Sequence, residues 1–166
     1  GAGLLVGSAS LSGFLAALRN GGGWDLDRRL IARPFPQPLK GGVPKDKEWA
    51  ALRQELARQA GIEIFIGGAK LANGLPIPAE GVEREFEFAK AAGVFVLPIG
   101  ATGGAAEKIC NQLQGSALSY KGSSPMRPTD KELKALADIN ALANAEGRTS
   151  LVNLVFQIID RVARVG

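Results

Sequence analysis

The chain has 166 residues, 46% hydrophobic and 22% charged, a size and composition typical of one globular domain. One cysteine and no histidine exclude a disulfide framework, Ser/His or Cys/His catalysis, and most zinc sites. The net charge of +4 favours an anionic partner, but 20 basic residues are interspersed with 16 acidic ones. Because no basic stripe results, we expect no nucleic-acid partner.

No apolar run approaches the roughly 18 residues of a membrane span, and no signal segment opens the chain. We therefore expect a cytoplasmic protein with no membrane partner, folded as a single domain over residues 1–166. No catalytic residue, metal ligand or bound cofactor is predicted. Cys110 falls within an apolar helical pattern and is interpreted as a small core residue.

The first twelve residues predict a glycine-spaced loop that runs into a helix. Ser8 or Ser10 could cap that helix, and Gly7 would let the backbone approach a phosphate or ribose. The helix carries its apolar residues on one face: Leu11, Phe14, Leu15 and Leu18. It is expected to end at residues 21–23, before a short strand at residues 30–33 that is stopped by prolines.

Two helices and a strand are predicted between residues 46 and 91. A helix is predicted from about Asp46 to Ala60, with Arg53 flanking its inward stripe. A strand at residues 62–66 would place Lys70 beyond the carboxyl edge of a parallel sheet, where ligands collect. After an expected loop at residues 71–79, a helix from about residue 80 to 91 carries Glu85 on a face toward that edge.

The stretch from Val94 to Ile109 organises the chain, because it runs from a buried strand through a glycine turn into a helix. Thr102 is expected to cap this helix. The glycines at 100, 103 and 104 would let backbone N–H groups approach an anion at the positive end of the helix dipole. The pattern therefore predicts a phosphate cradle, although a plain strand–helix connection fits a lone glycine turn equally well.

The last third predicts an irregular segment at residues 115–128 and two helices. Thr129 and Glu132 form a capping box that starts a helix to about Ala145, which Gly147 is expected to stop. The final helix, residues 150–164, has a broad apolar face, since Val152, Phe156 and Ile159 lie off its main stripe. We predict that part of this face contacts a second subunit.

Helices alternate with strands, and glycine turns stand at the strand ends, which is typical of an α/β fold with a Rossmann-like parallel sheet flanked by helices. Five motifs in one order resemble the SLOG-type (STALD) nucleotide-sensor domains of antiphage defence, similar to the carboxy-terminal domain of Thoeris NADases, which follows a sirtuin-like domain. The motifs are Pro34-Phe35-Pro36-Gln37, Trp49-x-x-Leu52-Arg53, the run from Ala60 to Lys70, Gly81-Val82-x-x-Glu85-Phe86-Glu87, and Pro98-Ile99-Gly100-Ala101-Thr102-Gly103.

The resemblance implies a regulatory domain without catalytic activity of its own. Its ligand would be a cyclic ADP-ribose isomer, or a related ADP-ribose or NAD-type nucleotide, made by a TIR-domain enzyme, and occupancy would switch on NAD depletion by an attached effector. A homo-oligomer, dimer or tetramer, is also implied. The ligand residues implied by motif position are Arg53, Lys70, Glu85, Gly7, Ser8, Gly100, Ala101, Thr102 and Gly103.

Domains of this family begin with a strand and a helix before the first glycine loop, whereas this chain begins at that loop, so the sheet is expected to lack that unit. Two other functions are open at this point. One is a nucleoside monophosphate N-glycosidase of the lysine-decarboxylase-like group, whose Pro-Gly-Gly-x-Gly-Thr-x-x-Glu signature the turn at residues 98–106 does not match. The other is a single-strand DNA binder. Such proteins stack bases on exposed aromatic side chains, and this chain is expected to expose few.

Overall fold

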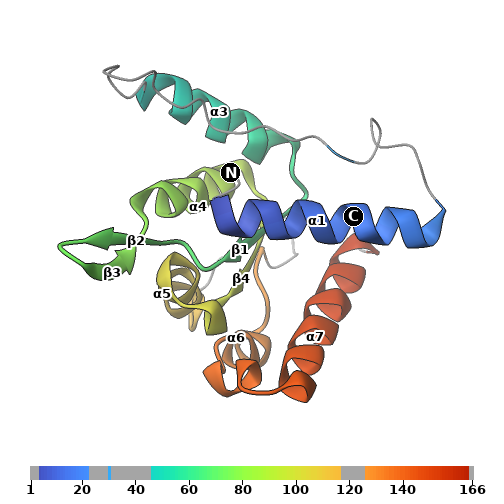
Figure 1. Cartoon of the computed structure of the whole chain (residues 1–166). Coiled ribbons are helices and arrows are strands. Elements are labelled where there is room, and N and C mark those ends of the chain that lie inside the picture. Colours follow the sequence, from blue (N-terminus) through green and yellow to red (C-terminus); the bar gives the residue numbers. More distant parts are fainter. Residues whose placement is uncertain (1–3, 23–29, 31–45, 117–125, 165–166) are drawn as a thin grey trace. The chain divides into compact units, whose positions relative to one another are not determined.

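The computed structural model describes residues 4–22, 30, 46–116 and 126–164 (Figure 1). It divides into two compact units, Gly1–Arg53 and Gln54–Gly166. One domain over the whole chain therefore remains a prediction. The first unit contains helix α1 (Leu4–Gly21) and the start of helix α3 (Asp46–Gln59), which ends in the second unit. The prediction of α3 is confirmed. The strand predicted at residues 30–33 lies outside the described residues except for Leu30, which has no regular structure.

Helix α1 corrects one prediction. Gly7 and Ser8 lie inside a helix that begins at Leu4, so the predicted loop over residues 1–12 is wrong from Leu4 onward. A glycine within a helix costs only about 1 kcal/mol relative to alanine, and the leucines and alanines around Gly7 favour the helix. A glycine-spaced pattern without proline is therefore a weak signal for a loop.

The second unit is built around two parallel strands, β1 (Ile62–Ile66) and β4 (Phe95–Ile99), in a register that pairs Ile62 with Phe95. Both strands were predicted from their apolar runs. β4 also has a backbone partner outside the sheet, since the N–H of Val96 donates to the carbonyl of Met126 at 2.8 Å. The α/β class with a parallel sheet flanked by helices is confirmed.

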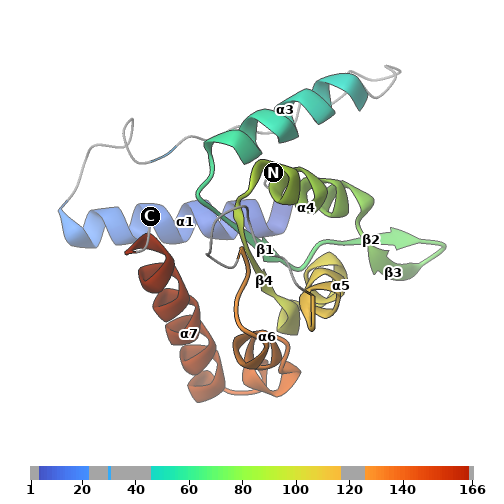
Figure 2. The same cartoon turned by 180° about the vertical axis from the view of Figure 1, so that it is seen from behind.

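Helices cover both faces of this sheet (Figures 1 and 2). On one face Phe65 and Val96 pack with α4 (Glu80–Ala92) and α5 (Gly104–Leu113). On the other face Phe95 and Leu97 pack with the last helix, α7 (Ala145–Ala163). Cys110 is fully buried on α5, as predicted. The core residues of the first face include Phe86, whose ring meets that of Phe65 edge-on at 6.1 Å between centroids.

A β-hairpin replaces the loop predicted at residues 71–79. Strands β2 (Ala69–Ala72) and β3 (Leu75–Pro78) pair antiparallel around Asn73 and Gly74, and the hairpin projects from the second unit in both views (Figures 1 and 2). Both turn residues have positive φ, 52° and 79°, as a two-residue hairpin turn requires. The Asn-Gly pair was the signal for this turn, and the prolines of β3, which lack an N–H, are typical of an edge strand.

The C-terminal helices also depart from the prediction. The capping box of Thr129 and Glu132 is confirmed, but α6 (Asp130–Leu136) is short, and a 3-10 turn, η2 (Ile139–Leu142), follows it. Gly147 does not stop a helix; it lies in the first turn of α7, where its N–H donates to the side chain of Asn144 at 2.7 Å. A Cβ at Gly147 would lie 2.6 Å from the carbonyl of Ala141, so close packing explains this glycine.

None of the helices in the described ranges has the length and hydropathy needed to span a bilayer.

Candidate functional site

The carboxyl ends of β1 and β4 meet because the strands are parallel, and Thr102 joins them. Its hydroxyl accepts a hydrogen bond from the N–H of Gly67 at 2.7 Å and donates one to the carbonyl of Ile99 at 2.6 Å. The prediction that Thr102 caps the following helix is wrong, since Gly103 is the N-cap of α5 and no side chain caps it. A threonine hydroxyl can hydrogen-bond either to the backbone at the start of a helix or to another nearby backbone group. Here it bonds to Gly67, which directly follows β1.

The N–H groups at the start of α5 bond to the loop that follows β1. Ala105 donates to the carbonyl of Gly68 at 3.0 Å, and Ala106 donates to the carbonyl of Gly67 at 2.9 Å. The N–H of Gly103 donates to Gly100 within the 3-10 turn η1 (Gly100–Thr102). An anion at this helix end would therefore compete with protein carbonyls, which weakens the phosphate-cradle interpretation of the turn.

The glycines of the turn have different roles. Gly104 crosses Gly68 so closely that a Cβ would lie 2.9 Å from its carbonyl carbon. Gly103 has φ 73° and ψ −169°, a conformation available almost only to glycine, and open space lies beside its Cα. Gly100 and Ala101 are buried and face the core. Of the predicted contacts at residues 100–103, only Thr102 and Gly103 are partly exposed.

Lys70 lies on β2 of the hairpin and forms an ion pair with Glu80, the first residue of α4. The Lys70 ammonium nitrogen is 3.0 Å from the Glu80 carboxylate oxygen. The hydrogen bond from Lys70, together with its charge, lowers the pKa of Glu80. The hairpin thus returns the chain so that a cation and a carboxylate ten positions apart meet at its base.

Glu85 is half-buried on α4, and a second carboxylate, Glu63 of β1, lies near it. Glu63 and Phe65 lie on the same face of β1. The ring of Phe65 contacts the ring of Phe86, the residue that follows Glu85 on α4. Burial, and secondarily the charge of Glu85, raise the pKa of Glu63 from 4.5 to about 7. Glu63 therefore carries a proton for part of the time at neutral pH.

Arg53 belongs to the first unit and is only 7% exposed. Its guanidinium lies 5.9 Å from the ring centroid of Trp49, one helical turn earlier on α3. An arginine at this position is more buried than the surface residue that the sequence pattern suggests. Gly7 and Ser8, the other predicted contacts of this unit, lie in the first two turns of α1.

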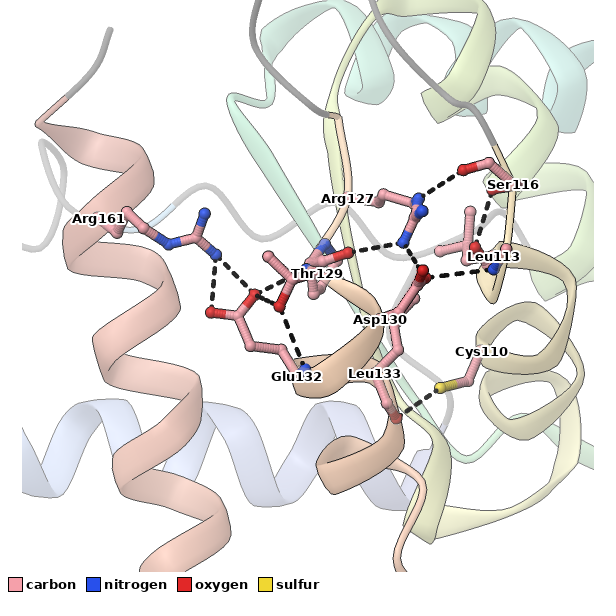
Figure 3. A network of polar contacts seen from close by, with 11 residues as sticks. Cys110, Leu113, Ser116, Arg127, Thr129, Asp130, Glu132, Leu133 and Arg161 are labelled. Atoms are coloured by element: carbon pink, nitrogen blue, oxygen red, sulfur yellow. Dashed lines mark hydrogen bonds and ion pairs between the residues drawn. The ribbon is translucent and has the colours of Figure 1, made fainter.

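A polar network behind the turn fixes α6 between α5 and α7 (Figure 3). Arg161 of α7 makes two hydrogen bonds to the carboxylate of Glu132, at 2.8 and 2.9 Å. The same carboxylate accepts the N–H of Thr129 at 2.7 Å, which completes the capping box. On the other side, the thiol of Cys110 donates to the carbonyl of Leu133 at 3.4 Å. Gly100 fits against Cys110 of α5 and Ala137 beyond α6, so this network supports the turn.

Two shallow clefts lie along α4 and α5. One, of about 320 Å³, includes Glu80, Glu83 and Lys108 in its wall. The other, of about 510 Å³, lies between Pro78 at the hairpin base and α5. Neither cleft is lined by a predicted ligand residue. The ligand contacts assigned by motif position therefore remain predictions.

Sequence reasoning missed two acidic residues beside the predicted contacts, Glu63 and Glu80. Glu63 had a signal, because it is the single charged residue of an otherwise apolar strand and has the same parity as the core residue Phe65. Glu80 had none, since its proximity to Lys70 depends on the hairpin, which was itself missed.

Comparison with known proteins identifies one family over almost the entire chain. The model of the Sir2- and TIR-associating SLOG family, STALD, matches residues 1–162. Among curated proteins, the chain is 32% identical over 160 residues to the NAD(+) hydrolase ThsA of Bacillus cereus, covering 96% of this chain and 32% of that protein. It is 33% identical over 132 residues to the NAD(+) hydrolase ThsA of Cytobacillus dafuensis, covering 80% of this chain and 27% of that protein.

The NAD(+) hydrolase ThsA of Acinetobacter baumannii is also similar, at 31% identity over 132 residues. The match covers 75% of this chain and 27% of that protein. The chain thus spans about a quarter to a third of the length of the curated relatives it matches.

Proposed function

Because the chain belongs to the Sir2- and TIR-associating SLOG family, we propose that it is the regulatory ligand-binding domain of an antiphage-defence NADase. The domain binds a cyclic ADP-ribose-type signalling nucleotide made by a TIR-domain enzyme. Binding activates NAD depletion by an attached effector domain. The observation that carries this proposal is the family match over residues 1–162, joined by relatives that are named NAD(+) hydrolases.

The second unit supports a ligand site at the end of its sheet. Ligands of open α/β sheets bind outside the carboxyl ends of the strands. Near that edge the chain offers the open surface of Gly103 and a lysine at the hairpin base. In this proposal the Glu85 carboxylate on the next helix is a further contact. A pyrophosphate is suited to a cation, and ribose hydroxyls are suited to a carboxylate acceptor.

In this proposal the domain is a sensor without catalysis, works in the cytoplasm, and assembles as a dimer or tetramer. Activation is a shift between two arrangements of subunits, which requires the nucleotide to bind one arrangement more tightly than the other. The exposed Phe156 on α7 is the contact we assign to a second copy.

The test is binding without turnover. The 166-residue chain is titrated calorimetrically with ADP-ribose, cyclic ADP-ribose and NAD, and the same mixtures are analysed by chromatography for released nicotinamide. We expect saturable binding of an ADP-ribose-type nucleotide and unchanged NAD. Steady release of nicotinamide by the pure chain, or no binding to any of the three compounds, would contradict the proposal.

A further inference from the structure

Lys70 and Glu80 form an ion pair at the base of the hairpin. It joins the hairpin to the first turn of α4 by one contact of 3.0 Å, and both side chains are open to solvent, 45% for Lys70 and 71% for Glu80. An ion pair exposed to this degree contributes little to stability, because water and salt screen it. The contact can therefore open at small cost.

Another glutamate of the same unit, Glu132, is held by more hydrogen bonds than Glu80. Glu132 makes two hydrogen bonds to Arg161 and also closes the capping box of α6, so its carboxylate has several partners at once. Within the described part of the chain, Glu80 makes a single side-chain hydrogen bond, to Lys70, through one oxygen. Among the helices of the described ranges, its carboxylate closes no capping box and holds no second helix, in contrast to that of Glu132.

We propose that Glu80 is an internal competitor of the ligand: its carboxylate occupies Lys70 in the unliganded domain and must be displaced by an anionic group of the nucleotide. This inference rests on the proposed function, because it takes Lys70 as a ligand contact. A lysine ammonium is a compact charge on a flexible stem, so it can exchange a carboxylate for a phosphate without any change in the backbone. Glu80 thereby raises the nucleotide concentration at which the sensor responds.

The chain contains a matched control for the test. Glu83 lies in the same first turn of α4 and forms one ion pair with a lysine, Lys108 of α5, at 2.7 Å. Glu80→Gln and Glu83→Gln remove the same charge from the same helix turn, but only Glu80→Gln releases Lys70. Calorimetric titration with ADP-ribose and with cyclic ADP-ribose compares the two variants and the parent chain at low and high salt.

We expect Glu80→Gln to bind the nucleotide about two- to fivefold more tightly than the parent chain, which is the scale of an exposed ion pair. The gain should shrink at high salt, and Glu83→Gln should bind like the parent chain. In a Lys70→Met background, Glu80→Gln should give no gain. Melting temperatures of the two glutamine variants measure any general effect of losing an acidic residue near the helix start.

The outcomes separate this inference from the function it rests on. If the parent chain binds and Glu80→Gln binds equally or more weakly, or if Glu83→Gln gains as much, the competitor role is wrong while the sensor function stands. If the gain survives in the Lys70→Met background, the effect does not pass through Lys70 and the inference is again wrong. If the parent chain binds neither nucleotide, the proposed function fails and the inference fails with it.

Discussion

The hydroxyl of Thr102 accepts the N–H of Gly67 at 2.7 Å, although the two residues are 35 positions apart in the chain. Thr102→Val keeps the shape of the side chain and leaves this partly buried N–H without an acceptor. We expect a loss of about 1–2 kcal/mol in the free energy of unfolding, measured by chemical denaturation. Thr102→Ser should retain most of the stability. Thr149→Val, which removes only an exposed hydrogen bond within α7, should change it by less than about 0.5 kcal/mol.

The close crossing of Gly104 and Gly68 predicts that adding one methyl group at Gly104 destabilises the fold more than Thr102→Val does. In Gly104→Ala the new Cβ meets backbone atoms at 2.9 Å and the residue must keep φ at +62°. We expect a loss of about 2–4 kcal/mol, since the strain of a left-handed residue adds to overpacking. Gly115→Ala is the control, because Gly115 has φ +69° and open space around it. An equal loss in both variants would show that the close crossing contributes nothing.

The raised pKa of Glu63 predicts a stability that depends on pH. A carboxyl group whose pKa is about 7 in the folded state and 4.5 otherwise favours folding below pH 4.5, and this stability is lost as the pH rises to about 7. The full shift corresponds to roughly 3 kcal/mol, and partial exposure reduces our expectation to about 1–2 kcal/mol. Glu63→Gln should therefore melt higher than the parent chain at pH 8 and equally at pH 4. The control is Glu87→Gln, a substitution at an exposed position of α4. The difference in melting temperature between this variant and the parent chain should be the same at pH 8 and pH 4.

Lys70→Ala tests the ligand site with little interference from folding. We expect nucleotide binding to weaken by about 1.5–3 kcal/mol, the scale of a charge-assisted hydrogen bond, with melting almost unchanged. Arg53→Ala should weaken binding similarly, but it also removes a buried side chain that packs over Trp49, so its melting temperature should fall. Lys131→Ala, on the exposed surface of α6, is the control. Unchanged affinity in Lys70→Ala would remove Lys70 from the site.

The exposed part of α7 predicts the assembly state. Phe156 is 60% exposed and Val152, one turn earlier, is 51% exposed. In a two-fold dimer such side chains would face their own copies. Phe156→Glu should then give a folded monomer that still binds nucleotide, measured by light scattering and circular dichroism. Ile158→Glu, at a fully buried position, should instead unfold the domain. A parent chain that is already monomeric, or an unchanged oligomer in Phe156→Glu, would contradict the prediction.

Elements with a strong periodic signal were predictable. The apolar runs of β1 and β4, the amphipathic pattern of α4, and the capping box at Thr129 each have a local cause, and each was placed within one or two residues. The errors occurred where a short signal opposed a longer one. The glycines and prolines of residues 71–79 predict a loop, and they obscure the turn signal of Asn73-Gly74. Gly147 predicts a helix end, because the sequence does not show that the residue packs closely against Ala141.

The site was less predictable than the fold, because its contacts depend on which strands end side by side. The hydroxyl of Thr102 bonds to Gly67 and not to its own helix, a choice that only the parallel register of β1 and β4 decides. Lys70 pairs with Glu80 only because the hairpin folds the chain back on itself. Ligand contacts assigned by motif position concern a bound nucleotide, so no pattern within the chain can test them.

The carbonyl oxygen of Gly68 accepts two N–H donors, one from Ala79 at the start of α4 at 2.8 Å and one from Ala105 at the start of α5 at 3.0 Å. A single peptide plane therefore holds the first turns of two helices. If that plane rotates, both turns lose an acceptor in the same event. Any ligand that reorients this peptide would expose the amides of Ala79 and Ala105 to hydrogen exchange together, and both helices would sense it at once.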